Sequence, residues 1–125
     1  MLVGVGVDLV EVRRIHRSIE MFGERFLHRV FTAGEIRYSE LKANRWERYA
    51  ARFAAKEAGM KALGTGWAGG VCWHDLEVNN EASGKPALKL SGAAAQLAAD
   101  KDVRRIWLSL SHTSQHAIAH VVLES

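Results

Sequence analysis

Hydrophobic and small or polar residues alternate at the start of the chain. One side of this pattern is apolar and the other is not: Val3, Val5, Val7 and Leu9 against Gly4, Gly6 and Asp8. A period of two predicts a β-strand over Leu2–Val10. Because glycine has no side chain, the face that carries Asp8 leaves room for another segment or a ligand to approach the backbone.

A helical period follows, in which apolar residues recur every three or four positions: Ile15, Ile19, Phe22, Phe26 and Val30. This period predicts helical structure over Val12–Phe31, with Gly23 as a candidate break. Thr32 and Glu35 have the spacing of a capping box, which predicts a further short helix. A longer helix is expected from Asn44 to Gly64, since glycine commonly ends helices.

The second half of the chain has mainly strand patterns. We expect strands over Val71–Val78 and Ala87–Leu90, joined by a turn at Ser83–Pro86. An alanine-rich helix over Gly92–Ala99 precedes two more strands, Arg105–Ser111 and Ala117–Leu123. There are no internal repeats and there is no linker, so the sequence predicts one α+β domain over residues 1–125.

Composition excludes several classes of protein. A chain of 125 residues that is 48% hydrophobic has enough apolar side chains for a packed core and is unlike a disordered protein. The single cysteine, Cys72, cannot form an internal disulfide and is interpreted as a small core residue. No apolar run reaches the roughly 20 residues of a membrane helix, and the N-terminus lacks signal-peptide features. We therefore expect a soluble cytoplasmic protein.

The charge is unevenly distributed along the chain. Residues 11–61 contain 12 Lys/Arg and 7 Asp/Glu, a balance of +5, whereas residues 62–125 contain 5 and 6, a balance of −1. A basic surface of this kind attracts phosphates, nucleic acid or an acidic protein. A solvated helix face with no ligand explains such a cluster about equally well.

On a helical wheel the long helix has an apolar stripe: Trp46, Tyr49, Ala50, Phe53 and Met60. Glu57 falls within this stripe, where a carboxylate is costly to bury without a compensating partner. Lys61, one turn on, offers an ordinary ion pair as the alternative explanation. A separate basic flank on the same helix is suited either to phosphates or to solvent: Arg45, Arg48, Arg52 and Lys56.

Asp8 is the second unusually placed acid, in an otherwise apolar strand. A strand carboxylate and a helix carboxylate that converge could bind Mg²⁺, which commonly takes one or two protein carboxylates together with substrate phosphates. With the basic flank and the glycine loop after Leu63, Asp8 and Glu57 indicate phosphoryl chemistry.

Other patterns carry less weight. The spacing of Gly64, Gly66 and Gly69 matches a dinucleotide fingerprint, but it follows a helix instead of a strand, which argues against a Rossmann site. His112, His116 and His120 are four residues apart, yet the strand–turn–strand pattern would scatter them, so zinc is disfavoured. Ser111 and His112 are neighbours on a strand and would point to opposite faces, so a serine hydrolase is disfavoured as well.

Three segments together resemble a known family. Gly6–Ile15, Arg52–Gly66 and Leu108–Thr113 are similar to the signature motifs of the holo-[acyl-carrier-protein] synthases, the short bacterial 4′-phosphopantetheinyl transferases. The resemblance covers essentially the whole chain. It implies a mainly antiparallel sheet with helices packed on it. It also implies transfer of 4′-phosphopantetheine from coenzyme A to a serine of apo acyl carrier protein, with release of adenosine 3′,5′-bisphosphate.

The resemblance also implies roles for individual residues. Asp8 and Glu57 would bind Mg²⁺, Lys61 would contact the phosphates, and the general base could be Glu57, Lys61 or a metal-bound water. The residues implied for coenzyme A are Arg45, Arg52, Lys61, Gly64, Gly66, His112 and Thr113. Arg14 matches the family's contact with the carrier protein. Positive charge suggests three further contacts with this partner, Arg13, Arg17 and Arg25. Met21 and Phe22 are apolar candidates for the same surface, although packing in the core explains Phe22 equally well.

The family resemblance further implies a homotrimer with a coenzyme A site at each subunit interface, and no nucleic-acid or membrane partner. Trp67 departs from the family pattern, in which an aliphatic residue is common at that position. The alternative function is a non-catalytic basic domain that binds RNA or an acidic protein through residues 13–56. This alternative gives no account of Asp8 and Glu57.

Overall fold

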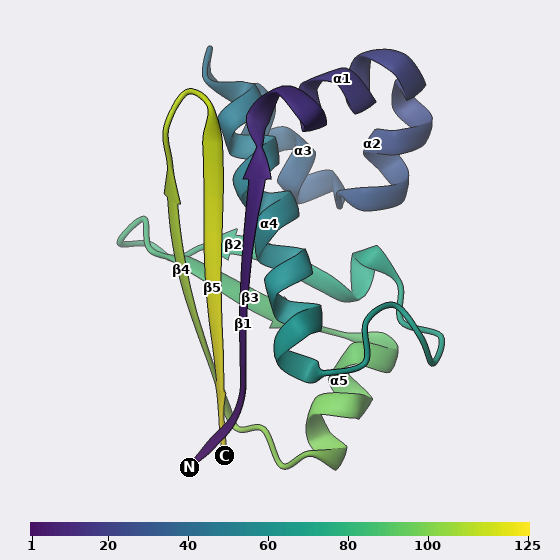
Figure 1. Cartoon of the computed structure of the whole chain (residues 1–125), viewed down its shortest axis with the longest axis vertical. Helices are drawn as coiled ribbons and strands as arrows, with labels where there is room; N and C mark the ends of the chain where they lie inside the picture. The colour runs from purple at the N-terminus through teal and green to yellow at the C-terminus, as the bar shows by residue number, and fades with distance from the viewer.

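The computed structural model describes all 125 residues and has two antiparallel sheets with five helices (Figure 1). The larger sheet has the strand order β1-β5-β4, and the smaller is the hairpin β2-β3. The elements are β1 (Leu2–Glu11), α1 (Val12–Phe22), α2 (Glu24–Val30), α3 (Ala33–Glu40), α4 (Arg45–Leu63), β2 (Leu76–Asn80), β3 (Pro86–Leu90), α5 (Gly92–Asp100), β4 (Arg105–His112) and β5 (His116–Glu124). The α+β prediction is therefore confirmed.

Most of the predicted elements are present, and individual residues at their ends explain where the helices begin and end. The helical period of residues 12–31 divides into α1 and α2 at Gly23, which has a φ of +58° that disfavours other residues. Thr32 and Glu35 form the expected capping box at the start of α3. Gly64 ends α4 in the left-handed conformation, as predicted for a C-terminal glycine.

The segment before β2 was predicted wrongly as strand. The second strand begins only at Leu76, and a single 3₁₀ turn at Trp73–Asp75 comes before it. The carboxylate of Asp75 accepts a hydrogen bond from the backbone N–H of Cys72, while the Asp75 N–H donates to the Cys72 carbonyl. These bonds compete with strand pairing. Cys72 is exposed, so its interpretation as a core residue is also wrong.

The long helix α4 lies directly against β1. A Cβ atom built on Gly4 would overlap the carbonyl oxygen of Ala62, and one built on Gly6 would overlap that of Ala58. The room that the glycines leave on this face is therefore filled by the backbone of α4. Asp8 lies on the same face of β1, beside the helix, and Figure 1 shows the two elements running side by side.

The core contains an ion pair that the charge pattern did not indicate. Lys56 and Glu35 are both fully buried, with 2.8 Å between Lys56 Nζ and Glu35 Oε1. Lys56 Nζ also donates to the carbonyls of Leu76 and Trp73, and Glu35 accepts from the backbone N–H groups of Thr32 and Val78. Burial lowers the pKa of Lys56, and the charge of Glu35 opposes that change. Lys56 is thus not part of a basic surface.

The outer face of the larger sheet is apolar and exposed. Six large hydrophobic side chains on β1, β4 and β5 are at least 40% exposed: Leu2, Val5, Val7, Leu9, Trp107 and Ile118. The helices cover only the opposite face of this sheet (Figure 1). An exposed apolar patch on a sheet is typical of an interaction surface. No helix is both long enough and apolar enough to cross a membrane.

We expect Gly6→Ala to lower the free energy of unfolding by about 3 kcal/mol or more, because the added methyl group forces the backbones of β1 and α4 apart. Urea denaturation measures this change. Gly34→Ala is the matched control, since a Cβ at Gly34 meets its nearest neighbouring atom only at 3.4 Å. Equal denaturation midpoints for the two variants would contradict the close contact.

Candidate active site

Asp8, Glu57 and Lys61 lie together where β1 meets α4. Lys61 Nζ donates to Asp8 Oδ1 at 3.1 Å and to the carbonyl oxygen of Val7 at 3.0 Å. The Asp8 side chain is only 16% exposed, whereas that of Lys61 is 54% exposed. The local ion pair between Glu57 and Lys61 that was considered from the sequence is absent, because Lys61 pairs with the strand acid instead.

Glu57 is a half-buried carboxylate in an unfavourable electrostatic position. Burial raises the pKa of Glu57, and the negative charge of Asp8 raises it further. The nearby indole of Trp67 and the positive charges of Lys61 and Arg14 act in the opposite direction without cancelling the rise. The two carboxylates therefore interact, and their charges are incompletely balanced by the protein.

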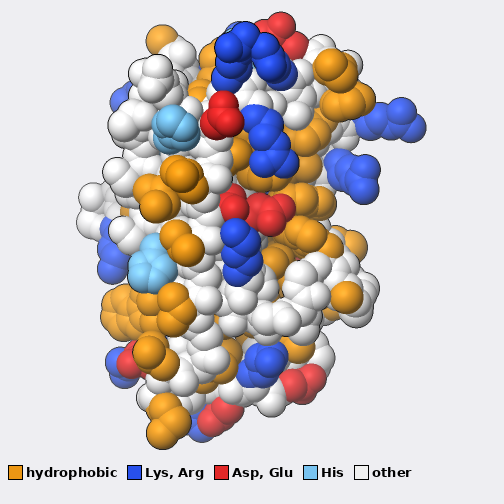
Figure 2. Space-filling model, viewed as in Figure 1, with side chains coloured by type: hydrophobic (Ala, Val, Ile, Leu, Met, Phe, Trp, Pro, Cys, Tyr) orange, Lys and Arg blue, Asp and Glu red, His pale blue; other side chains and the backbone are white.

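Two carboxylates with unbalanced charge fit a hard divalent cation. No group of three or more metal-ligating side chains is present, so a closed structural metal site is not indicated, nor is one formed by His112, His116 and His120. Mg²⁺ suits a site with one or two carboxylates, because it completes its octahedral shell with water and substrate phosphates. On the face seen in Figure 2, acidic side chains lie near the centre with basic side chains on either side.

A row of aromatic side chains lies next to this acid pair. The Arg14 guanidinium lies over the Phe53 ring at 5.6 Å, Phe53 stacks on Trp73 at 5.2 Å, and Trp73 contacts Trp67 at 4.0 Å. Trp67, at the end of this row, belongs to the glycine loop and lies near Glu57. The sequence marked Trp67 only as a departure from the family pattern, because a loop has no periodicity that predicts contacts.

A second group of charged residues lines a small pocket of about 210 Å³ at the other side of α4. The guanidinium groups of Arg48 and Arg52 lie over the Tyr38 ring at 4.4 and 3.8 Å. Arg52 is 3% exposed, donates to Asn80 Oδ1 at 2.7 Å, and has an Nε with no hydrogen-bond partner. Burial lowers the pKa of Arg52.

The composition of this pocket favours an anion. His112 lines it together with the two arginines, and no acidic residue does. A buried guanidinium with an unpartnered N–H is costly unless a ligand supplies an acceptor. Of the two alternatives left open for the basic flank of the helix, plain exposed charge is excluded for Arg52, because this residue is buried. Tyr38 and Asn80 were not found from the sequence, because they come from segments distant in the chain.

The other residues that the sequence suggested for coenzyme A lie outside this pocket. Arg45 is exposed, donates to Glu40 and lies over the Trp46 ring. The Thr113 hydroxyl accepts hydrogen bonds from two backbone N–H groups of the turn between β4 and β5. Gly64 and Gly66 lie in the exposed loop after α4, both with positive φ. Of the residues that the sequence suggested for coenzyme A, only Arg52 and His112 line this pocket within one chain.

The two groups of residues face different directions from α4. Arg52 and Glu57 are five positions apart, which places them about 140° apart around the helix at about 100° per residue. The acid pair lies on the side of β1, whereas Arg52 faces α3 and the β2-β3 hairpin. Within one chain, a single ligand that contacts both groups would have to pass around the helix.

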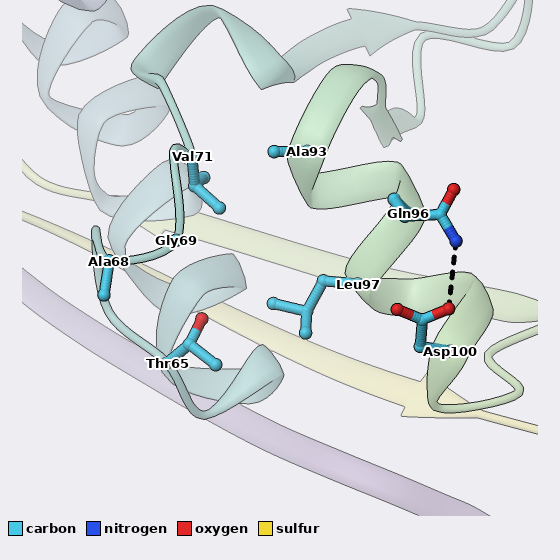
Figure 3. A pocket seen from close by; sticks show the side chains of 8 residues that line it. All are labelled: Thr65, Ala68, Gly69, Val71, Ala93, Gln96, Leu97 and Asp100. Atoms are coloured by element: carbon cyan, nitrogen blue, oxygen red, sulfur yellow. Dashed lines mark hydrogen bonds between the residues drawn. The ribbon is translucent and has the colours of Figure 1, made fainter.

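A different cavity of about 350 Å³ lies between the glycine loop and α5 (Figure 3). Thr65, Ala68 and Val71 line one side, and Leu97 points in from α5. The only ionisable lining residue, Asp100, accepts a hydrogen bond from Gln96 at 2.9 Å. This cavity therefore has none of the charged chemistry of the two sites described above.

The basic residues of the first helices form an exposed surface. Arg13, Arg14 and Arg17 on α1 and Arg25 on α2 are all exposed. Phe22, Arg25, Phe26 and Arg29 line a hollow of about 370 Å³. Met21 and Phe22 are exposed at 74% and 56%, so Phe22 is not a core residue. Arginines around exposed apolar side chains are suited to an acidic, amphipathic partner.

Comparison with known proteins gives consistent results. Residues 4–121 match the model of the 4′-phosphopantetheinyl transferase superfamily. A holo-[acyl-carrier-protein] synthase of Solibacter usitatus is 59% identical over 125 residues, with full coverage of both chains. The crystal structure of the Neisseria meningitidis holo-[acyl-carrier-protein] synthase superposes with a TM-score of 0.91 at 34% identity, again with full coverage of both chains. A Bacillus anthracis synthase in complex with CoA (3′,5′-ADP) has a TM-score of 0.82 at 39% identity, covering 100% and 98% of the two chains.

The raised pKa of Glu57 predicts that Glu57→Gln stabilises the metal-free protein at neutral pH. A carboxyl whose folded pKa is raised contributes stability below its unfolded pKa, and this contribution is lost as pH rises through the folded value. We expect a gain of about 1–3 °C in the melting temperature at pH 7.5, vanishing near pH 4. Thermal unfolding with a chelator measures it, and Glu81→Gln, at an exposed acid, should change nothing. A lower melting temperature for Glu57→Gln at pH 7.5 would contradict the prediction.

Proposed function

Because this chain belongs to the holo-[acyl-carrier-protein] synthases of the 4′-phosphopantetheinyl transferase superfamily, we propose that Asp8, Glu57 and Lys61 are its catalytic residues. The reaction is the transfer of 4′-phosphopantetheine from coenzyme A to a serine of apo acyl carrier protein, with release of adenosine 3′,5′-bisphosphate. The convergence of the two incompletely balanced carboxylates beside Lys61 is the observation that carries the assignment of the site.

Asp8 and Glu57 are the proposed ligands of Mg²⁺. Their carboxylates supply the hard oxygen atoms that Mg²⁺ prefers, and the diphosphate of coenzyme A supplies further oxygen ligands. When bound, Mg²⁺ neutralises charge on the diphosphate, which stabilises the negative charge that develops on the departing nucleotide phosphate. The unfavourable position of Glu57 in the metal-free protein supports this role, because a cation removes that cost.

Lys61 is suited to hold the diphosphate in place. Its ammonium group has three N–H donors, of which two are directed at Val7 O and Asp8 Oδ1. The third is free for a phosphate oxygen, and the exposed side chain can reach one. The reaction breaks the P–O bond between the two phosphates and forms a bond from phosphorus to the serine oxygen, so a fixed diphosphate favours in-line attack.

The pocket at Arg52 is the proposed site for the nucleotide end of coenzyme A. Its buried guanidinium, the neighbouring Arg48 and the absence of acidic lining residues support a phosphate ligand there. Arg45, Thr113, Gly64 and Gly66 are further proposed contacts, carried by family resemblance. Structures of synthases from Bacillus anthracis and Helicobacter pylori are described as complexes with coenzyme A, which supports this ligand for the present chain.

The different directions in which the two groups face from α4 support a site shared between two copies of the chain. If the diphosphate lies at Asp8 of one copy, the nucleotide can reach an Arg52 pocket only by passing around α4 or by entering a second copy. We propose the second arrangement, in a homotrimer whose subunits meet at the exposed apolar face of the β1-β5-β4 sheet. Val5, Val7 and Leu9 provide the apolar area that such an interface buries.

The surface of α1 and α2 is the proposed docking site for acyl carrier protein, through Arg13, Arg14, Arg17 and Arg25. Arg14 lies close enough to Glu57 to affect its pKa, so a carrier protein bound there would place its serine near the catalytic residues. The hollow beside Phe22 and Phe26 offers apolar contacts next to the charges. Met21, which is also exposed, would extend them.

We further propose that residues 1–125 form one domain, which acts in the cytoplasm without a nucleic-acid or membrane partner. The alternative of a basic RNA-binding or acidic-protein-binding domain loses support, because Lys56 is buried in an ion pair and Arg52 is buried in a pocket. Both were among the positive charges that suggested such a surface.

The transfer reaction tests the catalytic assignment. The protein incubated with coenzyme A, MgCl₂ and apo acyl carrier protein is expected to add one phosphopantetheine group, detected by mass spectrometry, and EDTA should stop the addition. We expect Asp8→Asn and Glu57→Gln to lower kcat/KM by about 10³-fold or more, because each loses a charged metal ligand. Glu81→Gln, at an exposed acid away from the site, serves as the control. Wild-type rates in either site variant would refute the metal assignment.

The shared site predicts that assembly and coenzyme A binding are lost together. Val5→Lys places a charge on the apolar sheet face and is expected to give monomers in light-scattering measurements, with coenzyme A affinity reduced about tenfold or more. Leu41→Lys is the matched control, because Leu41 is equally apolar and 74% exposed but lies outside the sheet. A monomeric Val5→Lys variant with full affinity would exclude a site shared between copies.

A further inference from the structure

A side-chain hydrogen bond joins the end of β4 to the start of α4. His112 Nδ1 lies 2.9 Å from Glu47 Oε1, although the two residues are 65 positions apart in the chain. Both side chains are partly exposed, His112 at 38% and Glu47 at 25%. His112 Nε2 has no hydrogen-bond partner in the protein.

The position of Glu47 needs an explanation, because a carboxylate near an anion pocket repels the anion. His112 lines the pocket together with Arg48 and Arg52, whereas Glu47 lines a neighbouring hollow with His16 and Trp46. Glu47 therefore contacts the imidazole from outside the pocket. Its charge is directed at His112 and not at the space that a ligand would fill.

We propose that Glu47 is a positioning residue for coenzyme A binding, which holds the imidazole of His112 so that Nε2 is available to a phosphate of the nucleotide. This inference rests on the proposed function, because it takes coenzyme A as the ligand of the pocket. The hydrogen bond that one ring nitrogen makes fixes the orientation of the ring and the role of the other nitrogen.

The chemistry of imidazole explains why a carboxylate is useful here. A ring that donates Nδ1–H to Glu47 can also donate Nε2–H when it is an imidazolium ion. A carboxylate at one nitrogen and a phosphate oxygen at the other are both hydrogen-bond acceptors, so a ring that carries both N–H groups can join the two. Arg48 and Arg52 face the same pocket from α4, which places two guanidinium groups beside the imidazole that a phosphate would contact.

A purely structural role for Glu47 is the competing explanation. Glu47 lies in the first turn of α4, where a negative charge stabilises the helix dipole. The side chain of Asn44, at the N-terminal cap, makes no capping hydrogen bond, and Glu47 is the acidic residue of the first turn. A loss of stability in a Glu47 variant therefore does not separate the two roles, and the test must measure coupling to His112.

A double-mutant cycle on coenzyme A binding makes this separation. Calorimetry on the intact protein gives Kd for coenzyme A, and transfer assays give KM and kcat, for the wild type, Glu47→Ala, His112→Ala and the double variant. We expect each single change to raise Kd and the KM for coenzyme A about tenfold, with kcat within about twofold. The double variant should bind no more weakly than His112→Ala. Glu47→Gln should recover part of the affinity, because its amide oxygen can accept Nδ1–H.

The experiment includes a control variant, and different results would contradict the positioning role and the proposed function. Glu24→Ala breaks a comparable exposed pair, His28–Glu24, at 2.6 Å on α2, and should leave Kd for coenzyme A unchanged. Effects that multiply in the double variant, or a fall in kcat with KM unchanged, would overturn the positioning role alone. A wild-type protein that binds no coenzyme A would overturn the proposed function, and the inference with it.

Discussion

The distance between β1 and α4 is the constraint on which the rest of the structure depends. Two glycines let the strand lie directly on the helix backbone, and no side chain separates them at Ala58 and Ala62. Asp8, two residues after Gly6, is thereby placed beside Lys61. The proposed catalytic residues lie close together because backbone packing has already brought β1 and α4 together. A small change in this spacing would alter both the core and the acid pair.

The rotation of α4 about its own axis is set by a second constraint. Lys56 precedes Glu57 and is fixed by Glu35 and by two carbonyl groups near β2. Burying an ion pair is costly in free energy, and breaking one partner away typically costs about 3–5 kcal/mol. The satisfied pair therefore selects one orientation of the helix. In that orientation Glu57 faces β1, and Arg52 faces the hairpin.

The sequence could predict those features that have a local cause. The alternation in β1, the capping box at Thr32 and the glycine end of α4 depend on neighbouring residues, so a single sequence is sufficient to find them. Lys56 and Arg48 look alike in the basic flank, yet only Lys56 has a buried partner, 21 positions away. The same limit applies to Asn80 and Glu47, whose contacts come from distant segments. Within the candidate site, Asp8 and Glu57 could be predicted because a carboxylate in an apolar pattern is unusual in itself.

The two faces of α4 have a genetic consequence in an assembly of identical copies. Each copy would contribute its acid pair to one site and its guanidinium pocket to the next. In a mixed assembly, a copy without Asp8 removes the acid half of one site, and a copy without Arg52 removes the pocket half of a site. When both defects fall in the same site, another site is formed by an intact acid pair from one copy and an intact pocket from the other. Two inactive alleles of this gene could then complement each other in one cell, as independent single-subunit active sites never could.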